Sequence, residues 1–371
     1  MERMYKFLGV IIIIVFLSYY ARQGEEVRYS EEVAIPFGIG YDLKSKVGDE
    51  VVYSIPITYY IFGSDGRTNN LTVEGEGSFV IETRSDRQRK INKKIFNGLE
   101  RMFIFSEEVA KDGIANIIDG LFNSHDINDH ALMVVCKDKT KHILEYEQQG
   151  YNSSTEFIEG LIKNLRFSYF FSDDFKVTNV SSKSLAEGRR VMLPYIEITH
   201  EGIVVTGAAI FTKDRMVLKL NLNEAKIMNL LSGSKGTGEL TLADDTYKFV
   251  GASAENKRKV KVIKEGDRYK FIINLNIDLE VTYNEQDMDI FENTKNLRIF
   301  KDRMSRQIEE QGEEFIHKMQ SVYKLDLLEL GRVASAKYGR RTGVDWDEVV
   351  SNSQIDVNVN VKVSRQGKGN Y

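Results

Sequence analysis

Ser232 and Lys235 have the spacing of a known nucleophilic pair. They match S-x-x-K, in which the serine forms an acyl intermediate. The S-D-N and K-T-G segments that accompany this pattern in penicillin-recognising proteins are missing, and a serine and a lysine at this spacing arise by chance in most chains of this length. A G-x-S-x-G nucleophile elbow is also absent. A Ser/Lys acyl-transfer enzyme is therefore only a third hypothesis, and we predict no catalytic residue.

The histidines do not predict a metal centre. No pair among them has a helical ligand spacing such as H-E-x-x-H. The strongest arrangement places His125 and His130 in one polar loop with Asp126 and Asp129. We interpret this stretch as a solvated loop, and no metal ligand is predicted. The remaining histidines are scattered: His142, His200 and His317.

Two glycine-rich stretches could suggest nucleotide binding. A P-loop connects a strand to a helix, and its lysine follows the second glycine of the motif. In Gly233–Gly238 the lysine precedes the second glycine. Gly38 and Gly40 lack the third glycine and the following helix of a dinucleotide fingerprint. Both stretches are better explained as turn or strand residues, so no cofactor is predicted.

Composition excludes other classes of protein. The net charge of −4 over 371 residues does not favour a nucleic-acid binder, which usually carries a basic excess. The single cysteine, Cys136, rules out a disulfide within the chain and a cysteine-based metal site. Because it ends the apolar run Leu132–Cys136, we interpret it as a small buried residue of a strand.

Strands and helices alternate along the first half of the chain. Ser106 is a good N-cap, followed by two glutamates in the first turn of a helix. The four-residue spacing of Ile91, Ile95 and Leu99 predicts a helix across 84–101. Segment 173–188 is polar and predicted to be irregular. The other predicted strands are 33–41, 51–62 and 132–136, and the clearest helix is 153–170.

The second half carries the two most regular strand patterns, 269–283 and 355–363, in which apolar residues alternate with polar ones. One apolar and one polar face are typical of antiparallel sheets. A long helix at 293–324 lies between them, with a 3-4 apolar spacing broken only by Gly312. We predict that this helix packs on the sheet. The fold class is α+β, multi-domain, with mixed or antiparallel sheets and packed helices.

The N-terminal segment predicts attachment to a membrane. Arg3 and Lys6 precede an apolar run of roughly 15 residues, the pattern of an export signal that sends the rest of the chain across the membrane. Tyr19, Tyr20 and Gln23 spoil the nearby cleavage frames. We therefore predict an uncleaved signal anchor at 1–22, an N-terminal domain at 23–190 and a C-terminal domain at 191–371.

Four segments, in order, resemble the Ger(x)C family, the C subunits of spore germinant receptors. No single segment is specific, but together they span more than 300 residues. The segments are Val33–Asp42; Ile104–Ile114 with Ile117–Leu121; Gly207–Val217 with Leu222–Ala225; and Gly331 to Val349 with the valine strand after it.

The resemblance implies a non-catalytic subunit of a nutrient-sensing complex on the outer face of the spore inner membrane. Its partners would be an A-type subunit and a permease-like B-type subunit. Family members are typically lipoproteins with a lipobox cysteine just after the signal. This chain has no cysteine before Cys136, so lipidation at that place is excluded. The alternative hypothesis is a stand-alone membrane-anchored extracytoplasmic binding protein with the same fold.

Overall fold

The fold is known from a computed structural model, which describes residues 16 and 32–366, apart from 49, 63–67, 124, 125, 173, 234, 235, 244–248, 267, 286–292 and 341. The predicted anchor at 1–22 lies, except for Phe16, outside the described residues. None of the helices that the structure describes is long and apolar enough to cross a membrane.

The first sheet has nine strands in the order β3-β2-β1-β5-β6-β7-β8-β9, with β4 paired to β1. Its centre is parallel, because β5 pairs in parallel with β1 and β6, and β6 with β7. Strands that are covered on both faces have continuous apolar sequences, and Met102–Phe105 is such a run, with every side chain buried. The strands are β1 Val33–Val47, β2 Glu50–Phe62, β3 Thr68–Gly77, β4 Lys94–Ile95, β5 Met102–Ser106, β6 Leu132–Cys136, β7 Val191–Thr199, β8 Gly202–Thr212 and β9 Arg215–Asn221.

Helices between these strands cover the faces of the sheet. Ser106 caps α3 by accepting the Val109 backbone N–H at 3.3 Å, which confirms the predicted N-cap. Ser153 caps α6 in the same way, accepting from Glu156 at 3.2 Å. The helices are α2 Val80–Gln88, α3 Glu107–Asp112, α4 Ala115–Phe122, α5 Thr140–Leu144, α6 Ser154–Ser168 and α7 Val177–Ser184.

Two predictions in this part are wrong. The helix expected across 84–101 ends at Gln88, and the chain then runs as an irregular segment and the short strand β4. Ile91 is buried although its backbone is not helical, and Ile95 pairs with Ala34 in the sheet, so their four-residue spacing does not reflect a helix. The stretch expected to be irregular contains α7, which is helical because Val177 and Val180 are both buried.

The second sheet has the order β10-β11-β12-β13. The predicted alternation in β12 and β13 is confirmed, since Phe271, Ile273 and Val357 point into the core. The expected antiparallel pairing is wrong for these two strands, which run parallel because the helical crossover between them returns the chain to the same end. The elements are α8 Leu222–Ser232, β10 Gly236–Ala243, β11 Phe249–Glu265, β12 Arg268–Asn284, α9 Thr294–Lys318, a π-helical turn Met319–Tyr323, α10 Leu330–Tyr338, α11 Trp346–Ser351 and β13 Gln354–Gln366.

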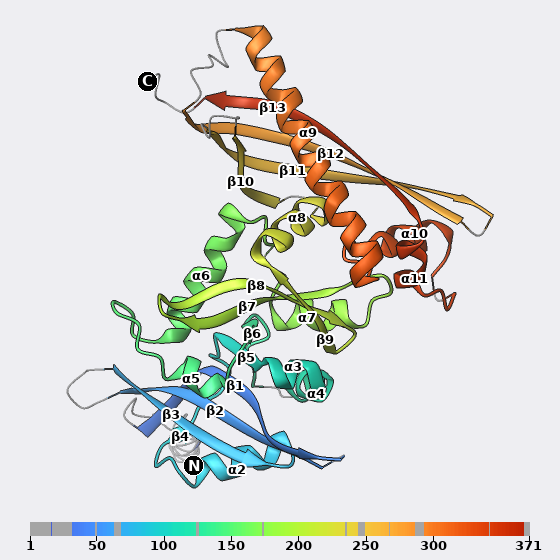
Figure 1. Cartoon of the computed structure of the whole chain (residues 1–371). Coiled ribbons are helices and arrows are strands. Elements are labelled where there is room, and N and C mark those ends of the chain that lie inside the picture. The colour runs from blue at the N-terminus through green and yellow to red at the C-terminus, as the bar shows by residue number, and fades with distance from the viewer. Residues whose placement is uncertain are drawn as a thin grey trace, which may run out of the picture.

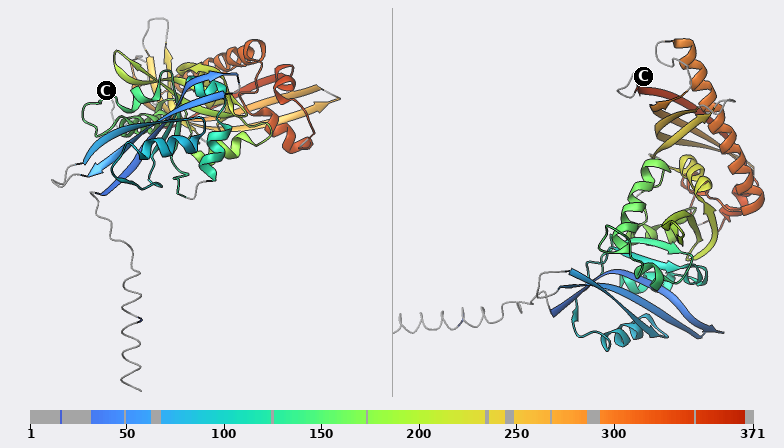
Figure 2. Two further views of the ribbon diagram at one scale, coloured as in Figure 1. Left: turned by 90° about the horizontal axis from the view of Figure 1, so that it is seen from below. Right: turned by 60° about the vertical axis from the view of Figure 1, so that its left-hand side comes forward.

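Figures 1 and 2 show the second sheet at the end of the molecule opposite β1–β3, with α9 lying along it. One apolar cluster joins the second sheet, α9, α8, α6 and one face of the first sheet, and a second cluster lies on the opposite face of the first sheet. Strands β7–β9 continue the first sheet beyond residue 190. The domain division at that residue stays a prediction, whereas the α+β class with two sheets and a long packed helix is confirmed.

Candidate functional site

The structure describes only some of the residues whose spacing could support chemistry, and those it describes do not form one site. Ser232 ends α8 and is half-buried, and its backbone carbonyl accepts from Arg258 Nη1 at 3.1 Å. Lys235 lies outside the described residues. His125 also lies outside them, and the exposed His130 has its Nε2 atom 3.7 Å from Asp129 Oδ1. Within the described part of the chain, no group of three or more His, Cys, Asp or Glu residues could hold a metal ion.

Cys136 behaves as the small buried residue that its sequence predicted. It ends β6 with no exposed surface, and its Sγ atom lies 3.1 Å from the Asp138 carbonyl oxygen. Burial raises the pKa of the thiol well above its usual value. Because the thiolate is the nucleophilic form, burial works against reaction at this cysteine.

A group of buried and half-buried charges lies where the first sheet meets the C-terminal helices. Arg190, directly before β7, donates from Nη1 to Thr212 Oγ1 at 2.6 Å and pairs through Nη2 with Asp347 in the first turn of α11. The same Asp347 carboxylate accepts the backbone N–H of Asp326 at 2.7 Å. One arginine thus ties β7 and β8 to two segments of the C-terminal part.

Asp326 holds the start of α10. Its carboxylate accepts the backbone N–H groups of Leu330 at 3.0 Å and Gly331 at 2.7 Å, two of the donors that a helix leaves unpaired at its N-terminus. Burial raises the pKa of Asp326 to about 6, against the lowering effect of these two bonds and of Arg190. The N-cap residue of α10, Glu329, has φ 51° and makes no side-chain cap, so Asp326 takes over that role.

Arg258 completes the junction from β11. Its Nη2 donates to the Leu328 carbonyl at 2.8 Å, alongside the Nη1 bond to Ser232. Burial lowers the pKa of Arg258 to about 10, and the charges of Asp326 and Glu329 oppose this. The guanidinium stays charged at neutral pH and fixes α8 and the residues before α10 against the second sheet.

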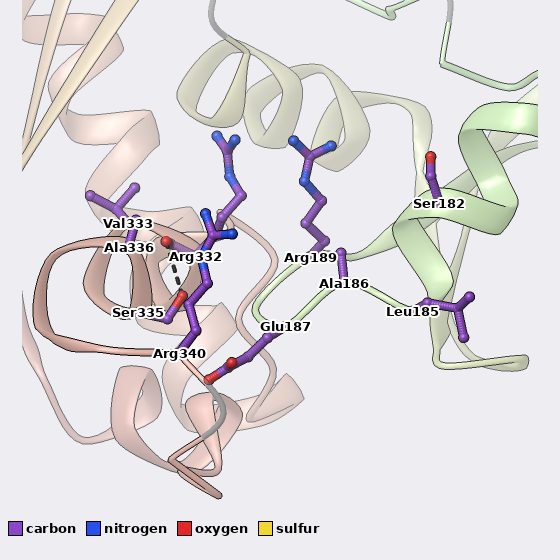
Figure 3. Close-up of a pocket in the computed structure, with 10 residues that line it drawn as sticks. All are labelled: Ser182, Leu185, Ala186, Glu187, Arg189, Arg332, Val333, Ser335, Ala336 and Arg340. Carbon is purple, nitrogen blue, oxygen red and sulfur yellow. Dashed lines mark hydrogen bonds between the residues drawn. The ribbon is translucent and has the colours of Figure 1, made fainter.

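A cavity of about 770 Å³ opens beside this junction. Its walls come from the segment between α7 and β7 on one side and from α10 on the other (Figure 3). Three arginines and one glutamate give the lining a formal charge of +2. The lining residues are Ser182, Leu185, Ala186, Glu187, Arg189, Arg332, Val333, Ser335, Ala336 and Arg340.

The chemistry available in this cavity is electrostatic recognition. Ser335 donates its hydroxyl to the Arg332 carbonyl at 3.1 Å, within its own helix. The described lining holds two serines, Ser182 and Ser335, and no histidine or lysine that could activate their hydroxyls. Arginine, in contrast, offers a planar fork of donors that matches carboxylate and phosphate.

None of these junction and cavity residues was singled out for chemistry from the sequence. Arg189 and Arg190 directly follow the stretch 173–188 that was predicted to be irregular, and Asp326 follows the long helix. The available signal was the pair of arginines directly after Glu187 and Gly188. Without the fold, nothing joins that pair to Asp347, which lies 157 positions further along the chain.

The fold defines a class: a two-sheet α+β protein whose architecture is like that of a solved structure. The chain matches the structure described as "Crystal Structure of the GerBC protein" with a TM-score of 0.56 and 14% identity, over 88% of this chain and 97% of that chain. At this identity the match shows the fold alone. None of the curated proteins matches the chain.

Two family models match in order along the chain. Residues 27–198 match the model described as "Spore germination protein N-terminal domain", and residues 206–367 match "Spore germination B3/ GerAC like, C-terminal". The chain therefore belongs to the Ger(x)C family of spore germination proteins, the C subunits of germinant receptors, as its sequence predicted. Membership implies a place in a germinant receptor complex and association with the spore membrane.

Proposed function

We propose that this chain is the non-catalytic extracytoplasmic C subunit of a receptor that triggers spore germination in response to a nutrient. The observation that carries the proposal is the match of both family models, in order, over nearly all of the chain after the N-terminal segment. The extensive apolar cluster between the two sheets supports a rigid body that acts by contact with other subunits. Its partners in this proposal are an A-type subunit and a permease-like B-type subunit.

The proposal places the body on the outer face of the spore inner membrane, held by an uncleaved anchor at 1–22. Basic residues before the apolar run keep the N-terminus inside. A lipid on the only cysteine is ruled out, because Cys136 is fully buried in β6. Mass spectrometry of the N-terminus of the protein from spores tests the anchor: a mature chain that begins after residue 20 contradicts it.

Deletion of the gene tests the function. We expect spores without this chain to lose germination with one nutrient while germinating normally with a non-nutrient trigger. Expression of the intact chain from another locus should restore the response. Co-purification from spore membranes should recover the A-type and B-type subunits with the chain.

An unchanged response to every nutrient tested, with the chain still found in the membrane, would overturn the proposal. That outcome would favour the alternative, a stand-alone extracytoplasmic binding protein. Neighbouring genes for A-type and B-type subunits would count for the receptor.

A further inference from the structure

We propose that the cavity between the α7–β7 segment and α10 binds a small organic anion that carries a carboxylate or a phosphate. The lining is positive, whereas the whole chain carries a net charge of −4. A positive cavity in an acidic protein is a local arrangement that overall composition does not explain. Its charge comes from Arg189, Arg332 and Arg340.

The arginines have hydrogen-bond donors to spare. Within the described part of the chain, the side chains of Arg189 and Arg340 form no ion pair or hydrogen bond. Among the described residues, Arg332 pairs through Nε, 3.2 Å from Glu329 Oε2, and its two terminal nitrogens bond to none of these residues and stay available to a ligand. The acidic residue of the lining, Glu187, accepts from Trp346 Nε1 at 2.9 Å and is already engaged.

Two of the guanidinium groups come from separate segments and extend in the same direction. Figure 3 shows the side chains of Arg189 and Arg332 reaching to one side of the cavity, while Glu187 reaches to the other. Both arginines also line an adjoining cavity of about 230 Å³, so they form the wall between the two spaces. An anion at that wall would meet two forks of N–H donors.

The backbone fixes this pair before any ligand binds. Gly188 has φ 66°, and a Cβ atom at this position would lie 2.3 Å from the backbone nitrogen of Arg332. Only glycine allows so close an approach in this conformation. Asp326 fixes the other side through its two bonds to the first turn of α10. Preorganised donors reduce the entropy lost on binding.

The size and the remaining lining indicate an organic ligand rather than a simple ion. A volume of about 770 Å³ is that of a site for small molecules. Leu185, Ala186, Val333 and Ala336 supply apolar surface around the arginines. The ligand class that fits is therefore a compact molecule with an anionic group at one end and an apolar body at the other.

The test is titration calorimetry on the purified full chain in nanodiscs of phosphatidylcholine, with succinate and glycerol 3-phosphate as probes and glycerol as the neutral control. We expect saturable binding of at least one anionic probe and none of glycerol. Arg189→Gln should weaken that binding by about tenfold or more, since a charge-assisted pair of hydrogen bonds is lost. Arg189→Lys keeps the positive charge but loses the planar pair of N–H donors, so its affinity should lie between those of the native chain and Arg189→Gln.

Two further variants separate the site from general charge. Arg298→Gln removes an exposed arginine on α9, distant from the cavity in sequence, and should leave binding unchanged. Ala336→Phe fills the cavity from α10 without altering a charge and should abolish binding. Equal thermal stability of all variants keeps the comparison valid. No saturable binding of either probe, or equal losses for Arg189→Gln and Arg298→Gln, would overturn the proposal.

The source of the anion is decided by a second arm with nanodiscs that contain phosphatidylglycerol. If that lipid competes with the soluble probe in the intact chain but not in Arg189→Gln, the anionic group belongs to a lipid headgroup. If it does not compete, the ligand is a free small molecule. The inference goes beyond the proposed function and is independent of it, because binding is measured on the purified chain and germination on spores.

Discussion

Arg190 and Asp347 are separated by 157 positions in the sequence and form an ion pair whose arginine side chain is only 10% exposed. The pair ties the start of β7 in the first sheet to α11, directly before the last strand of the second sheet. A partly buried charge pair of this kind costs free energy when one partner is removed, because the other charge loses its compensation. The pair therefore bears on how firmly the two sheets are held together.

We expect Arg190→Met to lower the free energy of unfolding by about 1.5 to 3 kcal/mol, the range for hydrogen bonds to charged groups. Asp347→Asn should have a smaller effect alone, and the double variant should show a coupling energy of about 1 kcal/mol or more. Chemical denaturation of the detergent-solubilised chain measures all three. Arg89→Met, which removes a pair whose arginine is 77% exposed, is the control and should cost less than about 1 kcal/mol. A coupling near zero would contradict the role of the junction.

Asp326 predicts a pH dependence with a defined sign. Its folded pKa of about 6 lies above the ordinary value of 3.8, so the folded state binds the proton more tightly than the unfolded state. Between pH 4 and pH 6, this residue therefore makes the fold less stable as the pH rises. The size of its contribution is about 3 kcal/mol, at 1.36 kcal/mol for each unit of pKa.

Comparison of the native chain with Asp326→Asn isolates the contribution of Asp326 to the pH dependence of stability, because the other carboxylates titrate in both proteins. The native chain should exceed the variant in stability by more at pH 4 than at pH 7. Chemical denaturation at the two pH values measures the difference. An advantage of the native chain that grows towards pH 7 would reverse the predicted sign.

Local patterns along the sequence predicted the strands and helices whose cause is local. The alternation in 269–283 and the cap at Ser106 depend on a few neighbouring residues, and both are confirmed. The order of the strands could not be predicted from the sequence, because the parallel pairing of β12 with β13 depends on how the long helical crossover between them packs. The prediction of a helix across 84–101 was wrong because contacts distant in sequence decide this segment. Ile91 is buried by tertiary packing and Ile95 pairs with a strand, and both override the helical spacing.

The candidate site was harder to predict than the fold. Arg189 and Arg332 lie 143 positions apart in the numbering and meet only through the close approach of Gly188 to α10. No spacing rule joins such residues. Asp326 carries no local signal either, since a single aspartate after a helix is usually solvated. Its role depends on burial, which the sequence around it does not show.

Gly331 lies within α10, where alanine would ordinarily be preferred by 0.5 to about 1 kcal/mol. Here a Cβ atom would lie 2.5 Å from Cβ and Cγ of Trp346, so the indole would have to move. We expect Gly331→Ala to destabilise the chain by about 1 to 3 kcal/mol, as overpacking does. The matched control is Gly120→Ala in α4, where a Cβ atom would meet no described atom within 4 Å beyond its own stretch of helix, and a small gain is expected. Thermal melting of both variants measures the contrast, and a stabilising Gly331→Ala would show that the contact is loose.

Gly312 gives the opposite expectation for the same substitution. It is buried within α9 at the one place where the apolar stripe of that helix is interrupted. A Cβ atom there would lie 3.4 Å from the nearest atom, Leu231 Cδ2, and 3.8 Å from Val357 Cγ1, both ordinary contacts with side chains. Gly312→Ala should therefore stabilise the chain by about 0.5 to 1 kcal/mol through helix propensity.

A larger side chain at Gly312 should reverse the effect, because α8 packs directly against this turn of α9. We expect Gly312→Leu to cost about 1 to 3 kcal/mol, since its extra atoms must displace Leu231. Chemical denaturation of the two variants beside the native chain measures both signs. If alanine and leucine both stabilise, the interruption at Gly312 is a gap in the core rather than a requirement of close helix packing; if both destabilise, α8 and α9 approach each other more closely than a methyl group allows.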